Sequence, residues 1–271
     1  MLKSSKKQLK LLSSILVVSL LILLVVSCAT RGAQSFNLFS IEDERSLGLQ
    51  VKNEIESNTK EYPILSEQGN EKIYQYIRNL SSSIINSGKL SHKDDFAWEI
   101  KIIDDDKTLN AFCTPGGYIY VYTGLIKFLD SEDELMGVLA HEIAHADLRH
   151  STRQLTKLMG FQVLLSVVSG NSDPSLIEQI ALSLTSLKFS RTHEIEADEH
   201  SVLYLCNSGY NAAGAAGFFK KMEGNSSPPQ FLSTHPDPGN RVENIEAKEV
   251  EMGCRGNSKN ESRYASMKKL L

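Results

Sequence analysis

Two histidines four residues apart constrain the fold of this chain more than any other sequence feature. In the stretch VLAHEIAHADLRH (138–150), His141 and His145 are one helical turn apart, and Glu142 directly follows the first histidine. Both imidazoles can reach one metal ion only if this segment is helical, because positions i and i+4 then share a face. The pattern alone fits either a metal site or an ordinary helix with two polar positions. A third ligand from elsewhere in the chain would decide between them.

A hydrolytic zinc site needs about three protein ligands and an open position for water. The extended motif HExxHxxGxxH would supply a third histidine, but the chain has Leu148 and Ser151 where that motif has glycine and histidine. The segment RTHEIEADEH (191–200) offers Glu194 and Asp198 instead, which share a helix face. One of them can bind the metal while the other accepts a hydrogen bond from a ligating histidine.

The other polar residues of these two segments are interpreted as structural. On a continuous helix His150 faces the side opposite His141. Glu196 faces away from the two acidic residues that share a face, and we interpret it as solvated. His193 and His200 have no partner at such a spacing, so neither is predicted to touch metal.

The first 28 residues have the composition of an export signal. Four lysines in MLKSSKKQLK precede 16 uncharged residues (11–26), fewer than the roughly 20 that a membrane-spanning helix needs. The stretch ends in VVSC, which resembles a bacterial lipobox with Cys28 as the lipidated residue. We predict a lipoprotein signal peptide over 1–27, with an uncleaved N-terminal anchor as the alternative. Both place the rest of the chain outside the cytoplasm.

The remaining chain is predicted to form one α+β domain. A lipidated tether over 28–40 precedes a mostly helical domain over 41–252, and a polar, partly disordered tail follows over 253–271. The alternating segment FAWEIKIID and the stretch YIYVYT after a Pro-Gly-Gly turn predict a small antiparallel sheet beside the histidine helix. The apolar residues 154–170 are too few to span a bilayer and predict a buried or surface-docking helix.

Charge and cysteine content restrict partners and compartment. The net charge is −4 and no long basic run occurs beyond the N-terminus, which argues against nucleic acid as a partner. Three cysteines follow the lipobox, and an oxidising compartment allows one disulfide and one free thiol. Cys206 and Cys254 can pair, whereas Cys113 lies in a strand-like segment; the sequence leaves the connectivity open.

Four segments occur in an order that resembles one known family. They are NAFCTPGGYIYVYTGLI, ELMGVLAHEIAHADLRH, EIEAD and STHPDPGNR, and they look like the signature segments of the HtpX-like zinc metalloproteases, which include the CAAX prenyl proteases. The match runs from about Ile41 to Glu251. The resemblance implies a zincin-type domain with one zinc ion per chain, held by His141, His145 and Glu194.

The same resemblance assigns roles to four further residues. It implies that Glu142 is the general base and that Asp198 and Arg241 support the metal ligands. It also implies that His235 lies near the zinc, where it either stabilises the oxyanion or occludes the site. A bracing role for His235 in the Pro-rich loop remains the alternative.

Without further membrane-spanning segments, the chain looks more like the lipoprotein, periplasmic branch of the family, which is associated with quality control of envelope proteins. The expected location is the bacterial envelope, lipid-anchored and facing the periplasm, with the outer membrane preferred. The expected partners are unfolded or misassembled envelope proteins, and the membrane through the N-terminal lipid.

The expected activity is that of a zinc-dependent endopeptidase. We expect GGYIYVYT to form an edge strand beside the active-site helix, with Gly117, Tyr118 and Tyr120 pairing with an extended substrate. The main alternative is an envelope lipoprotein chaperone or assembly factor whose zinc site is plugged or structural. A metal-dependent hydrolase of non-peptide substrates is a second alternative, which no sequence feature specifically favours.

Overall fold

The computed structural model describes residues 37–223, 230–237 and 239–271. The chain divides into two units, Met1–Asn37 and Leu38–Leu271, and the second contains nearly all described residues. The predicted signal peptide (1–27), Cys28 and most of the tether (28–40) lie outside the described residues. Among the residues that are described, none of the helices is both long and apolar enough to cross a membrane.

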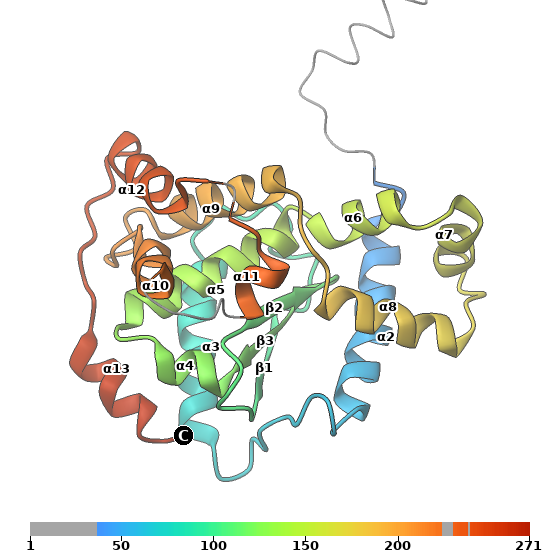
Figure 1. Ribbon diagram of the computed structural model, residues 1–271, viewed down its shortest axis with the longest axis horizontal. Coiled ribbons are helices and arrows are strands. Elements are labelled where there is room, and N and C mark those ends of the chain that lie inside the picture. The colour runs from blue at the N-terminus through green and yellow to red at the C-terminus, as the bar shows by residue number, and fades with distance from the viewer. Residues whose placement is uncertain (1–36, 224–229, 238) are drawn as a thin grey trace, which may run out of the picture. The chain divides into compact units, whose positions relative to one another are not determined.

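The described part of the chain is mostly helical and contains a small three-stranded sheet (Figure 1), which confirms the predicted α+β class. The strands are β1 (Glu99–Ile103), β2 (Ala111–Thr114) and β3 (Tyr118–Tyr122). The helices are α2 (Ile41–Ser57), α3 (Glu71–Ile85), α4 (Thr123–Phe128), α5 (Glu132–Asp147), α6 (His150–Leu158), α7 (Phe161–Val168), α8 (Pro174–Thr185), α9 (Arg191–Leu205), α10 (Gly214–Glu223), α11 (Gln230–Thr234), α12 (Arg241–Glu251) and α13 (Glu261–Lys268).

The sheet is mixed, although the sequence predicts an antiparallel one. Its strand order is β1-β3-β2, with β3 antiparallel to β2 and parallel to β1. The hairpin between β2 and β3 closes through Gly116 and Gly117, whose φ angles of 77° and 82° suit glycine. Because this hairpin occupies one side of β3, β1 pairs along the other side.

The prediction that the segment GGYIYVYT forms an edge strand is therefore wrong. Strand β3, which contains Tyr118 and Tyr120 and follows Gly117, is the central strand, and all five of its residues are buried. Its backbone already pairs with a strand on each side and cannot accept a substrate strand. The outer strand that packs against α5 is β2. Alternating strand patterns indicate burial but do not specify the order of strands in the sheet.

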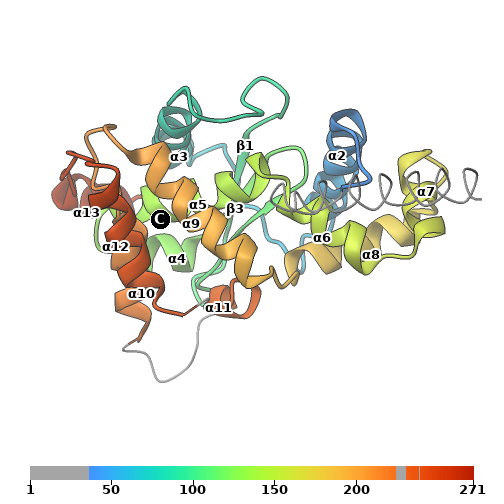
Figure 2. The same ribbon diagram turned by 90° about the horizontal axis from the view of Figure 1, so that it is seen from above.

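Helix α5 is the centre of the domain. Every residue of it except Glu134 is buried, and it packs against α9, α10, α3 and β2 (Figures 1 and 2). Glycines allow α10 to approach closely, since a Cβ atom on Gly137 would lie 2.1 Å from the backbone nitrogen of Ala215. A Cβ atom on Gly214 would lie 2.0 Å from the carbonyl oxygen of Asp133. This packing holds the histidine helix in a rigid setting.

A second hydrophobic cluster joins α2 to α6, α7 and α8. It is tied to the end of α5 by Arg149, which has a left-handed backbone conformation (φ 59°) between α5 and α6. The Nε atom of Arg149 lies 2.6 Å from a carboxylate oxygen of the buried Glu44 on α2. Thr152 donates a hydrogen bond to the same oxygen. The turn after the HEIAH segment is thereby fixed to α2.

The C-terminal residues pack on the domain, in contrast to the predicted polar tail over 253–271. They form α13, whose Tyr264 is fully buried and donates a hydrogen bond to the carbonyl oxygen of Ile126. Arg263 contacts the buried carboxylate of Glu132 at the start of α5. One tyrosine and one arginine among polar residues show little periodicity, so the sequence pattern misses this helix.

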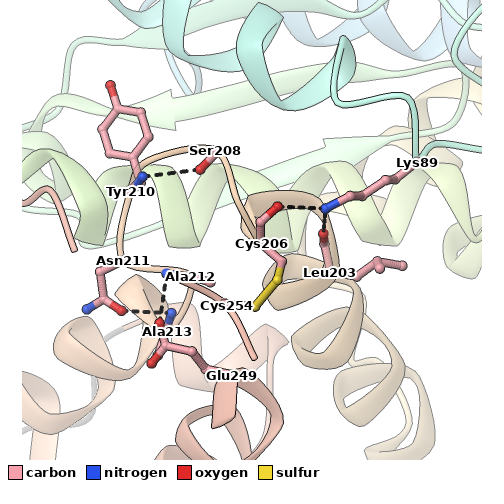
Figure 3. Close-up of a disulfide and its surroundings, with 10 residues drawn as sticks. All are labelled: Lys89, Leu203, Cys206, Ser208, Tyr210, Asn211, Ala212, Ala213, Glu249 and Cys254. Carbon is pink, nitrogen blue, oxygen red and sulfur yellow. Dashed lines mark hydrogen bonds between the residues drawn. A yellow bond between two sulfur atoms is a disulfide. The ribbon is translucent and has the colours of Figure 1, made fainter. Parts of the chain in front are cut away.

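A disulfide connects the end of α9 to the segment after α12 (Figure 3). It joins Cys206 to Cys254, the pair that the sequence allows, and Cys113 is a buried free thiol. The ammonium of Lys89, from the loop after α3, donates hydrogen bonds to the carbonyl oxygens of Leu203 and Cys206. The C-terminal end of α9 is therefore held from two directions.

Candidate metal centre

Three separate segments bring polar side chains to one buried point. Helix α5 carries His141 and His145 one turn apart, and α9 contributes Glu194 from its first turn. His235 follows α11 directly. These four residues each offer a ligand atom, and all four atoms lie within 4.8 Å of one another.

The spacing of the ligand atoms suits a tetrahedral metal ion. The Nε2 atoms of His141 and His145 are 3.0 Å apart, and each is 3.4 to 3.5 Å from a Glu194 carboxylate oxygen. The Nδ1 atom of His235 lies 3.4 Å from His141 Nε2 and 3.2 Å from Glu194 Oε1. Zinc–ligand bonds of about 2.0–2.1 Å in a tetrahedron would separate neighbouring ligand atoms by about 3.3 Å. The donor set therefore fits zinc.

The site is closed to solvent in this conformation. His145, Glu142 and Glu194 are fully buried, and His141 and His235 are 1% exposed. With the imidazole of His235 included, four protein ligand atoms surround the point where a metal would bind, all within 4.8 Å of one another. A hydrolytic site needs one of these positions for water or substrate. His235 follows the short helix α11, whereas the other three residues belong to α5 and α9.

Arg241 and Asp198 support the ligands from α12 and α9. The guanidinium of Arg241 donates two hydrogen bonds to the Asp198 carboxylate, at 2.7 and 2.8 Å, and its Nη2 atom lies 3.1 Å from Glu194. Asp198 Oδ1 lies 2.9 Å from Nδ1 of His141. Because the carboxylate accepts the Nδ1 proton, Nε2 of His141 is left free for metal. The two residues that the resemblance picked out are thus in contact with the ligand cluster.

A second chain of hydrogen bonds reaches His145. It includes His150, interpreted from the sequence as structural, and Glu196, interpreted as solvated. The Nδ1 atoms of His145 and His150 are 2.9 Å apart, and Nε2 of His150 lies 3.0 Å from a carboxylate oxygen of Glu196. Burial lowers the pKa of His150, which favours a neutral ring with a single N–H. The carboxylate can only accept, so that N–H points to Glu196 and Nδ1 accepts from His145.

Glu196 is half-exposed, as a solvated residue would be, but its carboxylate also accepts a hydrogen bond from His150. Helix α6 begins after a left-handed residue, which breaks the helix that the sequence analysis assumed to be continuous, and this turns His150 toward His145. The ring of His193 stacks on His150 with centroids 4.4 Å apart and is not part of the metal cluster. The Nδ1 atom of His200 forms a hydrogen bond with the backbone carbonyl oxygen of Glu196 and is not part of the metal cluster either.

Ionisation in the cluster suits metal binding. Burial alone would raise the pKa of Glu194, but the neighbouring His235, His141 and His145 hold it well below its usual range. Burial lowers the pKa of His145 well below its usual range, which favours the neutral ligand form. Glu194 is thus a carboxylate and His145 a neutral imidazole at neutral pH, the forms that bind zinc. Burial and Arg241 lower the pKa of His141, but its contacts with Asp198 and Glu194 outweigh them and raise this pKa to about 9, so a metal ion would have to displace a proton from this ring.

Glu142 is the fully buried carboxylate beside the cluster that makes no hydrogen bond. Neither of its oxygens has a hydrogen-bond partner, and Nε2 of His235 is 3.5 Å from Oε1. Burial raises the pKa of Glu142, an effect that the nearby histidines His235 and His141 oppose. An unpartnered buried carboxylate costs free energy unless the site uses it. Its position next to the ligand atoms would allow it to accept a proton from a group that enters the site.

Aromatic rings stack on His235 and His145, and no sequence pattern marks them. The ring of Phe231 on α11 stacks on His235 at 4.3 Å, and Phe189 stacks on His145 at 4.0 Å. The backbone nitrogen of Phe231 donates to the carbonyl oxygen of Leu109, just before β2. No spacing motif marks these rings, since each acts through a contact with a segment distant in the chain.

The HEIAH helix, the glutamate from a second helix and the buried carboxylate between them define a metallopeptidase. Residues 71–249 match the model of peptidase family M48, and the chain belongs to this family. The resemblance inferred from the four ordered motifs is thereby confirmed.

Curated relatives agree with this assignment. The chain is 35% identical over 148 residues to mitochondrial metalloendopeptidase OMA1 of Arabidopsis thaliana, covering 54% of this chain and 30% of that protein. It is 29% identical over 184 residues to the putative beta-barrel assembly-enhancing protease of Vibrio cholerae, covering 62% and 37%. It is 27% identical over 226 residues to metalloprotease LoiP of Escherichia coli, covering 79% and 84%. The chain thus spans about a third of the first two proteins and most of LoiP.

Proposed function

We propose that this protein is a zinc-dependent endopeptidase of the bacterial envelope that hydrolyses unfolded or misassembled envelope proteins. The observation that carries the proposal is the buried set of ligand atoms at tetrahedral spacing, with the unpartnered carboxylate of Glu142 beside it. The name of the Vibrio cholerae relative supports an envelope protein as substrate. Lipid attachment at Cys28 would hold the enzyme at a membrane facing the periplasm, with the outer membrane preferred.

In the proposed mechanism His141, His145 and Glu194 hold the metal. Zinc held by these residues would lower the pKa of a water molecule and polarise the scissile carbonyl group. Glu142 takes the proton of the attacking water and then passes it to the leaving amine nitrogen. The buried setting of Glu142 favours proton uptake, because burial raises the pKa of its carboxyl. Arg241 keeps Asp198 in place, and Asp198 keeps the His141 ring oriented.

His235 is proposed to close the site when no substrate is present. Its Nδ1 atom lies within 3.2 to 3.4 Å of Glu194 and His141, at the position that a water or substrate oxygen would need. Movement of α11 would withdraw the imidazole and uncover Glu142 at the same time. This geometry favours occlusion over the alternative role in which His235 braces a loop.

An extended substrate is proposed to pair with β2. This strand is an outer strand of the sheet and packs against α5, whereas β3 is paired on both sides. Main-chain pairing depends little on side chains, so unfolded segments of many sequences would be accepted. The preference for unfolded or misassembled clients follows from this mode of binding.

One observation favours a second candidate function, that of an envelope chaperone or assembly factor with a plugged zinc site. Structural zinc sites fill all four positions with protein ligands, and here His235 would supply the fourth. In that case binding of unfolded clients would not depend on Glu142.

Cleavage of an unfolded protein by the zinc-loaded full chain tests the proposal. Wild type is compared with Glu142→Gln and with His235→Ala at matched zinc content, with reduced casein as substrate. We expect Glu142→Gln to lose cleavage while it retains zinc, and His235→Ala to cleave faster than wild type. If wild type and His235→Ala both hold zinc and neither cleaves, the peptidase proposal fails and the chaperone function is favoured. Suppression of client aggregation by Glu142→Gln then measures that second function directly.

A further inference from the structure

Exposed apolar side chains gather on α7 and the residue that ends α6. Leu158 and Phe161 are each 65% exposed, Leu165 is 44% exposed and Val163 is 37% exposed. The surface of a helix that faces water normally carries charged side chains. Residues 158–172 contain no aspartate, glutamate, lysine or arginine. We call these four exposed side chains the α7 patch.

The α7 patch is held in a fixed orientation by the other side of the helix. Leu164 and Val167 are buried in the cluster that α7 shares with α2 and α8. Because these two residues face the domain, the helical period places Leu165 on the outward side of α7 and Phe161 and Val163 on its two flanks. Figures 1 and 2 both show α7 at the end of the domain farthest from α12 and α13. The α7 patch therefore has a fixed orientation on the domain and is separate from the metal centre.

The polypeptide enters the described domain beside this patch. The backbone nitrogen of Leu38 donates a hydrogen bond to Oγ1 of Thr156 on α6, two residues before Leu158. The predicted lipid attachment at Cys28 lies ten residues before Leu38. Ten residues span at most about 35 Å when fully extended. A lipid on Cys28 would thus keep α6 and α7 close to a bilayer surface.

The charges that border the patch suit an anionic bilayer. Lys157 precedes Leu158, and both are exposed. Lys188 is exposed as well, and the side chain of Gln154 on α6 donates a hydrogen bond to its carbonyl oxygen, which places Lys188 next to this helix. Lysine side chains at the rim of an apolar surface can reach lipid phosphates while the apolar groups enter the interface.

We propose that the α7 patch docks on a lipid bilayer and forms a second membrane contact beside the N-terminal attachment. Exposed apolar side chains on a helix that carries no charge, lysines at the border and an adjacent chain entry are the features of a helix that lies in a membrane interface. Since α6 connects α7 to the HEIAH helix, docking would fix the direction in which the metal centre faces the membrane. This inference does not depend on peptidase activity.

A fluorophore on the patch, read out with the full chain in vesicles, tests this proposal. Gln162 is exposed on the outward side of α7, and Val250, 79% exposed on α12, is the control position at the far end of the domain. Each is replaced by cysteine and labelled with an environment-sensitive dye. The sulfur of Cys28 carries the predicted lipid, Cys113 is buried, and Cys206 and Cys254 are joined in the disulfide, so the dye reacts with the introduced cysteine. The vesicles contain phosphatidylethanolamine, phosphatidylglycerol and a lipid brominated near the headgroup end of its acyl chains.

We expect the dye at 162 to shift to the blue and to be quenched by the brominated lipid, and the dye at 250 to show neither effect. Replacing Phe161 and Leu165 with serine should abolish quenching at 162 without changing the melting temperature, since both side chains are exposed. Co-sedimentation with the vesicles measures attachment of the chain separately. If the vesicle-bound protein shows no quenching at 162, or equal quenching at 250, the proposal is overturned. Iodide quenching of the dye at 162 is also measured without vesicles. If this quenching falls as the protein concentration rises, the patch forms a contact between two copies of the chain, and the membrane proposal is overturned.

Discussion

Replacement of His150 with phenylalanine tests whether the hydrogen-bond chain behind His145 contributes to metal binding. In the native protein Glu196 accepts from His150, and His150 in turn accepts the Nδ1 proton of His145. This arrangement keeps the proton off Nε2 of His145, the atom that faces the other ligands. Phenylalanine preserves the ring and its stacking on His193 but removes the acceptor.

The expected effect is a 10- to 100-fold loss of zinc affinity, the typical consequence of losing a partner that orients a ligating histidine. This loss corresponds to about 1.4–2.8 kcal/mol. It agrees with the cost of about 1–3 kcal/mol for leaving the buried N–H of His145 without an acceptor. In the metal-free protein the proton can move to Nε2, so the cost falls on the zinc-bound state and appears in the affinity.

Competition with a chromophoric zinc chelator at one fixed neutral pH measures this affinity, and nitrogen-15 spectra of the histidines report the tautomer of His145. His193→Phe is the matched control, since it alters the other ring of the same stack without touching the hydrogen-bond chain. Glu196→Leu should also weaken zinc binding, whereas Glu196→Gln keeps an acceptor for His150 and should remain near wild type. Because Glu196 is half-exposed, we expect both of its variants to fold like the wild type. Equal zinc affinity in folded His150→Phe and wild type would refute the reasoning.

Three further changes have expected outcomes that follow from single contacts. Arg241→Lys loses the paired hydrogen bonds to Asp198 and should lower zinc affinity roughly tenfold in the same chelator competition; unchanged affinity would show that the pair does not support the site. Gly137→Ala forces a Cβ atom against the backbone of α10 and should destabilise the protein by about 1–3 kcal/mol in urea unfolding. Gly160→Ala is the control, because a Cβ atom at this position meets no other atom and causes no such clash. Tyr264→Ala should cost about 3–5 kcal/mol in the same assay, because a buried ring is removed; a much smaller loss would mean that α13 is not part of the folded core.

Several features of this protein follow from local spacing and were predictable without the structure. The HEIAH segment places two histidines on one face because the helical period does so in any context. Glu194 and Asp198 share a face for the same reason, and the structure brings both of them to His141. The mixture of helical and strand periodicities predicts the α+β class, and the Pro-Gly-Gly turn predicts the hairpin between β2 and β3.

Other features depend on contacts between distant parts of the chain. The position of His235 among the ligands was implied only by the family resemblance, since a histidine in a Pro-rich loop has no periodicity that points to a metal. Glu196 faces away from Glu194 along α9, yet it meets His150 because α6 begins in a new direction after a left-handed residue.

By itself the sequence determined which residues can share a helix face, where apolar stretches occur and to which family the chain is similar, because these depend on spacing and order along the chain. Only the tertiary structure decided that β3 lies at the centre of the sheet, that the C-terminal helix is buried through Tyr264, and that the ring of His235 lies beside His141, His145 and Glu194. The physical reason is that burial and strand pairing are settled by the competition of all segments for the same core. The sequence of an alternating or polar stretch does not specify which other segment it will pack against or pair with.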